Sequence, residues 1–173
     1  MTPYLENFKG GTPVRPEEKD QAVQRAKSLT ADQRVVVLVE LSSPMSEESL
    51  PVHFDNGEWK RFFLSGDQPG SGKPAYWWPG LGGCSSLAIR AQNCGPRSVV
   101  ADFRQWVGQL TEKDGNNLKN LELNLRKLRM AAMGGKVYGF IHTVTGRDKL
   151  IELLEMKEIR MAYIIENVPG LSD

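Results

Sequence analysis

A continuous run of apolar side chains lies between charged ends in the segment RVVVLVEL, from Arg34 to Leu41. The run is rich in β-branched residues and is apolar at both odd and even positions, which is typical of a strand covered on both faces. Two later segments, KVYGFIHTV over 136–144 and IRMAYII over 159–165, have strand composition as well. We therefore expect three strands that share one sheet.

Segments with helical periodicity lie before these strands and between them. Pro16 suits the first turn of a short surface helix that ends near Thr30, and Ser98 is placed to cap a second helix. A third helix, the most clearly amphipathic one, is predicted to end at Gly134-Gly135. A fourth follows Arg147. The third helix is predicted from apolar residues that repeat every three or four positions: Leu118, Leu121, Leu125, Leu128 and Ala132.

The last third of the chain therefore alternates strand, helix and strand. One helical crossover between two strands implies parallel pairing, or a split arrangement around a third strand. With Arg34–Leu41 as the third strand, the expected fold class is α+β, a ferredoxin-like antiparallel sheet with helices packed on one face. A long insertion that contains both cysteines separates the first strand from Val137. We expect an extended leader over 1–16, which is rich in Gly and Pro, and a single α+β domain over 17–173.

Length and charge narrow the class of protein. The chain has 173 residues, of which 40% are hydrophobic and 25% are charged, and this suits one well-buried core. The formal net charge of +1 gives no basic footprint, so we expect no nucleic acid as the main partner. No stretch has the roughly 18 apolar residues of a membrane span. The start of the chain also lacks an apolar signal core, so export or membrane attachment would need a segment absent from this sequence.

The two cysteines, Cys84 and Cys94, lie in the glycine-bracketed stretch GLGGCSSLAIRAQNCGP. They have neither CxxC spacing nor companions that could complete four zinc ligands. A short-loop disulfide is the simplest interpretation, and it predicts an extracytoplasmic or secreted domain. The alternative is two unpaired thiols in a cytosolic protein.

Motifs that would point to catalysis or to a cofactor are incomplete. The segment GDQPGSGKP, over 66–74, departs from a phosphate-binding loop in its spacing and in having Pro74 where a Ser or Thr is needed. His53 and His142 are the only histidines, and no G-x-S-x-G nucleophile motif accompanies them. Glu152, Glu155 and Glu158 follow one helix edge beside lysines, as a solvated face does. We expect no catalytic residue, no cofactor and no metal site.

An aromatic cluster, Tyr76, Trp77 and Trp78, lies in the Gly- and Pro-rich stretch 65–83, which is predicted to be one long loop. Flat aromatic faces with a polar handle could bind sugar rings, bases or proline side chains. Alternatively, these rings fold back into the core under the loop, because long loops need such attachment. The three residues are the candidate binding site of this sequence.

The segment over 137–167 resembles the second half of subtilisin-type propeptides and related protease-inhibitor domains. These domains carry a strand with a Gly-Phe pair, a short leucine-bearing helix, and a closing strand that ends in Tyr-x-x-Glu. The residues at matching places are Gly139, Phe140, Leu150, Leu153, Ile159, Tyr163 and Glu166. The resemblance implies a ferredoxin-like sheet and a C-terminal tail that enters a protease cleft. The first half of the chain departs from the family pattern through its long insertion.

Three functional hypotheses follow. The first is a non-catalytic extracytoplasmic domain that binds another protein, with a subtilisin-like protease as the first partner to test. The second is an enzyme of an unrecognised class, whose sign would be a pocket with a perturbed carboxylate or histidine. The third is a sensory or carbohydrate-binding domain that uses Tyr76 to Trp78.

Overall fold

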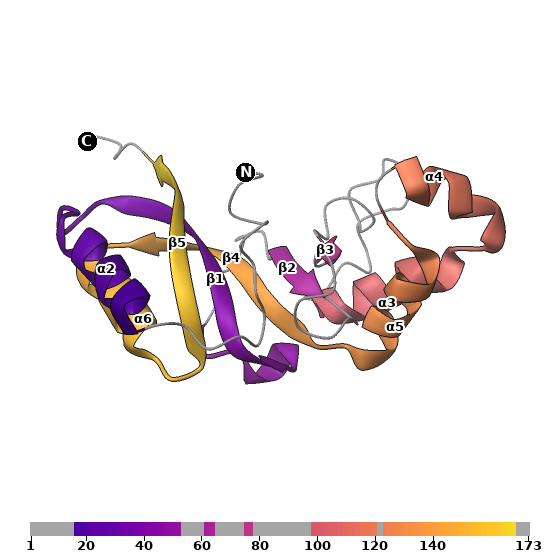
Figure 1. The fold of residues 1–173 in the computed structure, drawn as a ribbon, viewed down its shortest axis with the longest axis horizontal. Coiled ribbons are helices and arrows are strands. Elements are labelled where there is room, and N and C mark those ends of the chain that lie inside the picture. The colour runs from indigo at the N-terminus through magenta and orange to yellow at the C-terminus, as the bar shows by residue number, and fades with distance from the viewer. Residues whose placement is uncertain (1–15, 53–60, 65–74, 78–97, 121–122, 169–173) are drawn as a thin grey trace, which may run out of the picture. The chain divides into compact units, whose positions relative to one another are not determined.

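A computed structural model describes residues 16–52, 61–64, 75–77, 98–120 and 123–168 of the chain. Helices and antiparallel strands occur together in these residues (Figure 1), so the predicted α+β class is confirmed. The chain divides into a first unit, Met1–Pro44 with Gly139–Asp173, and a second unit, Met45–Tyr138. Of the predicted leader over 1–16, only Pro16 is described, and a helix begins there.

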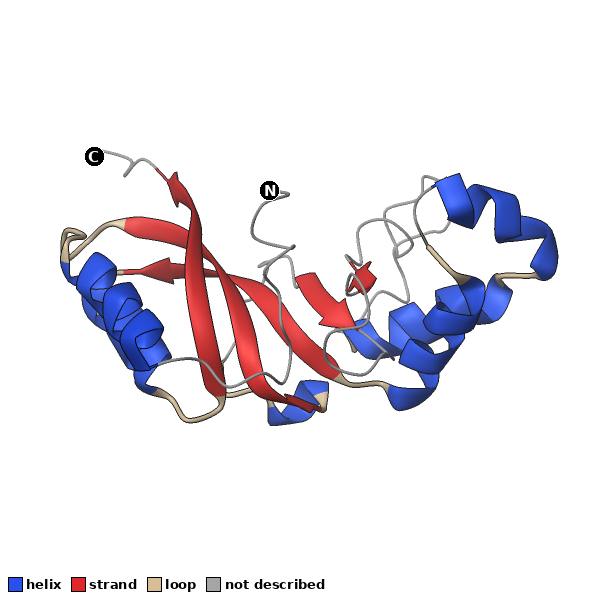
Figure 2. Ribbon diagram, in the orientation of Figure 1, coloured by secondary structure: helices blue, strands red, loops and turns tan. Residues whose placement is uncertain are grey.

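The described residues of the first unit form two helices and three strands. Helices α2 and α6 pack against each other and both contact β5, and Figure 2 draws the two helices together. Leu150, Leu153 and Leu154 of α6 are buried, as their spacing predicts. The elements, in chain order, are α2 (Pro16–Lys27), β1 (Arg34–Met45), β4 (Val137–Thr145), α6 (Arg147–Glu155) and β5 (Ile159–Val168).

Strand β1 lies between β4 and β5 in the sheet of this unit. It pairs with β5 in antiparallel fashion, with Leu38 opposite Tyr163. The register shifts between Glu40 and Leu41, where Arg160 of β5 is the extra residue of a β-bulge. Most side chains of β1 before Ser42 are buried, which confirms a strand covered on both faces.

The second unit contains short strands and a group of helices. Strand β2 pairs with β3 in antiparallel fashion, and helix α3 packs against α5. The elements are η1 (Glu47–Ser49), β2 (Arg61–Leu64), β3 (Ala75–Trp77), α3 (Val99–Gln109), η4 (Glu112–Asp114), α4 (Gly115–Asn120) and α5 (Leu125–Gly134). The core side chains of this unit include Phe62, Phe63, Trp77, Val99, Phe103, Val107, Leu118 and Leu128.

The hydroxyl of Ser98 and the carboxylate of Glu47 fix the start of α3. Ser98 accepts a hydrogen bond from Ala101 N at 3.2 Å, which confirms the predicted cap. Glu47 adds a second cap from η1: its carboxylate accepts from Val99 N and Val100 N, both at 3.1 Å, and from the Ser98 hydroxyl at 2.6 Å. The first backbone N–H groups of the helix, which have no partner within it, are thereby satisfied.

The prediction of a single helix over 118–132 is wrong. The chain forms α4 and α5 instead, and Asn124 lies between them in an extended conformation. Its side chain accepts a hydrogen bond from Lys127 N at 3.2 Å, so it starts a new helix where the leucine periodicity alone indicated continuity.

The prediction of one loop over 65–83 is also wrong in part. Ala75–Trp77 forms strand β3, in which Tyr76 is opposite Phe63 and Trp77 is opposite Phe62. The aromatic residues supply strand propensity that outweighs the surrounding glycines and prolines.

Candidate functional site

Helix α5 is fixed in the second unit along its whole length. Four of its side chains are buried, and they lie on the side that packs with α3 or the rest of the core. An apolar stripe of this kind holds one side of a helix and leaves the opposite side facing outward. The buried side chains are Leu125, Leu128, Ala131 and Ala132.

Both ends of α5 are held by hydrogen bonds as well. Asn124 caps the first turn, as described above. Gly135 follows the last turn in the left-handed conformation, with φ 57°. Arg104 of α3 donates from Nε to the carbonyl oxygen of Ala132 at 2.7 Å, so a cation satisfies one of the carbonyl groups at the end of the helix. The outward side of α5 is therefore presented on a rigid element.

The outward side of α5 combines apolar and basic side chains. Met130 is 42% exposed and Met133 is 76% exposed, and no other large hydrophobic side chain among the described residues is exposed. The two lie one turn apart, so they form one small apolar patch. Arg126, Lys127 and Arg129 are exposed on the same helix. At 3.6 residues per turn, Arg129 and Lys127 fall on opposite flanks of the methionines, and Arg126 lies one turn before Met130.

Helix α5 also lies in a basic part of the chain. From 115 to 138 the sequence contains five basic residues and one acidic residue, Glu122. Arg129 pairs with Glu112 of η4 at 2.9 Å, but both side chains are largely exposed, so water screens this pair. A positive surface therefore surrounds the two methionines.

Chemically, this surface can bind an apolar group and negative charges at once. Methionine is flexible and polarisable, and it adapts to apolar side chains of different shapes. Guanidinium groups bind carboxylates through paired hydrogen bonds. We call Arg126, Lys127, Arg129, Met130 and Met133 the α5 surface. Sequence analysis missed it, although the spacing RKxRMxxM at 126–133 carries the signal.

Trp77 is the one residue of the predicted aromatic site whose side chain is described. It is 6% exposed, and its ring centroid lies 4.8 Å from that of Trp106 and 5.4 Å from that of Phe103. Its indole Nε1 is buried and has no hydrogen-bond partner in the described structure. Tyr76 contributes its backbone to β3, and Trp78 lies outside the described residues.

A charged pair lies inside the first unit. Arg160 donates a hydrogen bond to Glu40, whose side chain is fully buried. Tyr163, half-buried on the same pair of strands, is affected by these charges. Burial of the phenol raises the pKa of Tyr163, the Glu40 carboxylate raises it further, and Arg160 opposes the shift. The pair is enclosed in the unit and joins β1 to β5.

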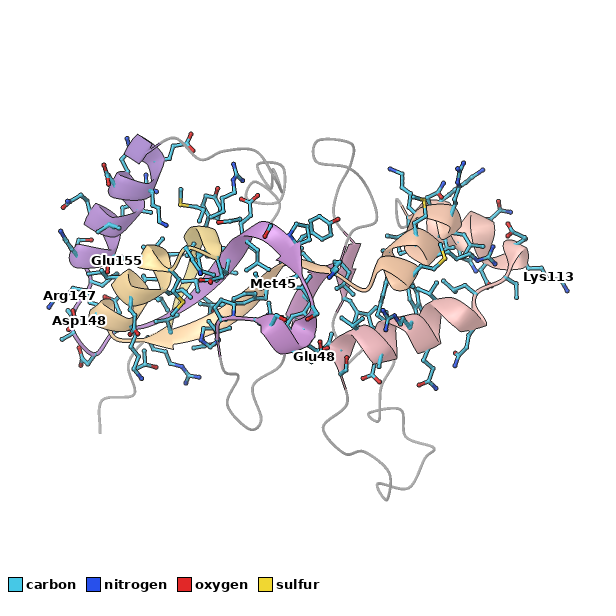
Figure 3. All side chains as sticks on the ribbon, turned by 90° about the horizontal axis from the view of Figure 1, so that it is seen from below. Met45, Glu48, Lys113, Arg147, Asp148 and Glu155 are labelled. Carbon is cyan, nitrogen blue, oxygen red and sulfur yellow. The ribbon has the colours of Figure 1, made fainter. Side chains whose placement is uncertain are left out.

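The remaining predicted residues do not converge on one site. His142 is half-buried in β4 with its ring 6.3 Å from that of Phe140, and His53 lies outside the described residues. Cys84 and Cys94 lie outside them too. Glu152 and Glu155 are exposed on α6, in agreement with a solvated edge, and Figure 3 shows Glu155 at the end of that helix. Within the described ranges, no group of three or more His, Cys, Asp or Glu side chains is placed to hold a metal ion.

Comparison with known proteins gives no relative. The chain matches no protein-family model, no curated protein and no solved structure. Among the described residues, no helix has the length and apolar character needed to cross a membrane.

Proposed function

We propose that the chain is a non-catalytic domain that binds another protein. The observation that carries this proposal is the exposure of Met130 and Met133 on a helix that is otherwise fixed in the core. Two exposed methionines placed side by side form a small apolar patch that a partner can cover, and methionine is enriched in protein interfaces.

The buried charges support binding over catalysis. Glu40 and Arg160 are paired inside the first unit, where a substrate would have to displace packed strands to reach them. The role that we propose for this buried pair is to specify packing. The enzyme hypothesis would need an accessible acid or base whose perturbation its local contacts do not explain. Tyr163 is half-buried, and the pKa of the partly exposed Asp114 is lowered by its hydrogen bonds with Thr111 in the same turn.

The direct test places a photo-crosslinking amino acid at position 133 in the full chain. We expect irradiation in the host cell to give a covalent protein adduct, because Met133 is exposed and the proposed partner would cover it. The matched control carries the same amino acid at Lys149, an exposed residue of α6. Met130→Asp should abolish the adduct at 133 by placing a charge in the apolar patch. Equal adduct formation at 133 and 149 would refute a protein-binding role for α5.

The scaffold that we propose for the first unit is ferredoxin-like. In its support, β1 separates β4 from β5 while α6 connects them. Such a fold also has a helix between its first two strands. Here the helix that packs beside α6 is α2, which precedes β1. The long insertion with both cysteines remains part of this proposal.

The first partner that we propose to test is a subtilisin-like protease outside the cytosol. The propeptide-like pattern over 137–167 supports this choice, and so does the expected disulfide. The test is inhibition of such a protease by the full chain and by a chain that lacks Val168–Asp173. We expect inhibition at micromolar concentration that disappears with the tail. Full protease activity in the presence of the full chain would exclude the inhibitor version and leave the crosslinking test to decide protein binding.

A further inference from the structure

The first turn of α5 departs from the usual charge pattern of helices. The positive end of the helix dipole favours acidic side chains there. Helices α3 and α6 follow this rule with Asp102 and Asp148 in their first turns. Helix α5 has no acidic residue in its first turn, and it carries Arg126 and Lys127 there. Basic side chains at this end oppose the helix dipole, so their placement suggests a role outside the helix.

We propose that the α5 surface binds an acidic segment of a partner protein. One apolar side chain of this segment would contact Met130 and Met133, and its carboxylates would pair with Arg126, Lys127 and Arg129. The inference rests on the proposed protein-binding function and adds the chemistry of the partner. The charge of the surface supports an acidic partner. The basic side chains flank the methionines, so an occupant needs negative groups around an apolar centre.

Two other occupants fit this surface less well. A second copy of the chain, docked through the same surface, would place Arg126, Lys127 and Arg129 against their own copies, and like charges repel. An anionic lipid surface would accept the basic groups, but interfacial helices insert a broad apolar face rich in Leu, Phe or Trp. In α5 the leucines are buried and only two methionines face outward.

The probe is a displayed library of random peptides of about 15 residues, a length at which a bound helix can form. It is selected against the full chain and, in parallel, against three variants. The variant Arg126→Glu with Lys127→Glu reverses the flanking charge and should fold at least as well, because it corrects the first turn of α5. Met133→Ser removes the exposed thioether. Lys149→Glu is the matched control, with an equal kind of charge change on α6.

We expect the selected peptides to place Asp and Glu around Leu, Ile, Phe or Trp. Individual peptides should bind the charge-reversed chain and Met133→Ser at least tenfold more weakly, and Lys149→Glu as well as the original chain. Their affinity should fall with added salt. Vesicles with phosphatidylserine should not compete.

Each alternative result overturns a defined part of the proposal. Selected peptides that lack acidic residues but still need Met133 would refute the acidic partner and leave the protein-binding function intact. Peptides that bind all variants alike would refute both. Binding of phosphatidylserine vesicles without peptide enrichment would assign the α5 surface to a membrane.

Discussion

Arg160 donates a hydrogen bond to Glu40 across the β1–β5 pair, where the Glu40 side chain has no exposed surface. The β-bulge at Arg160 makes this contact possible, because the extra residue can turn its side chain toward the strand position occupied by Glu40. Both charges have lost most of their hydration. Each therefore depends on its partner, and removal of one leaves the other uncompensated.

We expect Glu40→Gln to lower the free energy of unfolding by about 3–5 kcal/mol, since a buried guanidinium then lacks its counter-charge. Urea denaturation followed by circular dichroism measures the loss. The matched control is Glu158→Gln, which removes a 3.7 Å pair with the exposed Lys157 and should cost at most about 1 kcal/mol. Glu40→Leu combined with Arg160→Met should cost less than Glu40→Gln. Equal losses for Glu40→Gln and Glu158→Gln would contradict the structural role of the pair.

The phenol of Tyr163 should ionise at a higher pH than an exposed tyrosine. Burial raises its pKa, with a further contribution from Glu40. The folded state then holds this proton more tightly than the unfolded state, so the stabilisation is present below about pH 10 and is lost as the pH rises through the folded pKa. Ultraviolet titration of tyrosinate, as the difference between the original chain and Tyr163→Phe, gives this pKa directly. A difference curve centred at or below about pH 10 would show that the phenol is solvated.

The Glu47 carboxylate should stabilise the second unit through the start of α3. It accepts from two backbone N–H groups and from Ser98, so Glu47→Ala leaves these donors unsatisfied. We expect a loss of about 1–2 kcal/mol in the free energy of unfolding. Glu48→Ala is the matched control, since Glu48 is the exposed neighbour labelled in Figure 3. Hydrogen exchange should also become faster at Val99 and Val100 in Glu47→Ala alone.

The sequence predicted those elements whose side chains repeat regularly over several turns or strand positions. Arg34–Leu41, the cap at Ser98 and the buried leucines of α6 belong to this class, because local propensity and burial there favour the same structure. The division at Asn124 was missed because one polar side chain, through a local hydrogen bond, overrode the leucine spacing. Strand β3 was missed because its pairing with β2 is a contact between distant residues.

The α5 surface was missed for a different reason. Periodicity identifies the buried side of a helix, and it gives no information about which outward residues form a binding surface. Exposure distinguishes Met130 and Met133 from the core methionine Met161, which is 4% exposed, and sequence alone does not give this exposure. Glu40 was similarly taken as a strand-end charge, because the register that buries it against Arg160 depends on a bulge in a strand far along the chain.

Cys84 and Cys94 should form a disulfide, and this pairing stays a prediction from the sequence, as does the extracytoplasmic location that it implies. Closure of so short a loop should add about 2–3 kcal/mol to the free energy of unfolding. Thiol titration under denaturing conditions should find no reactive thiol before reduction and two afterwards. Cys84→Ser combined with Cys94→Ser should lower the unfolding midpoint to that of the reduced protein. Two reactive thiols in an unreduced, oxidised sample would contradict the pairing and the expected compartment.

The adjacent glycines at the end of α5 should respond to alanine in opposite directions. Gly134 lies within the helix, and a Cβ there would meet no atom within 4 Å, so Gly134→Ala should raise the free energy of unfolding by about 0.5–1 kcal/mol. Gly135 has φ +57°, which costs other residues about 1–2 kcal/mol, and its Cβ would lie 2.0 Å from an Arg104 guanidinium nitrogen. Gly135→Ala should therefore displace Arg104 from the Ala132 carbonyl and lower stability by about 2–3 kcal/mol, because a charge-assisted hydrogen bond is lost as well.

A cycle with Arg104→Ala separates the two causes of this loss. If the clash with Arg104 contributes, Gly135→Ala should cost less in the Arg104→Ala background, where only the backbone conformation opposes the new side chain. Urea denaturation of the four proteins measures this coupling. An equal cost of Gly135→Ala in both backgrounds would show that the left-handed conformation alone reserves this position for glycine. A stabilising effect would show that α5 does not end at this residue.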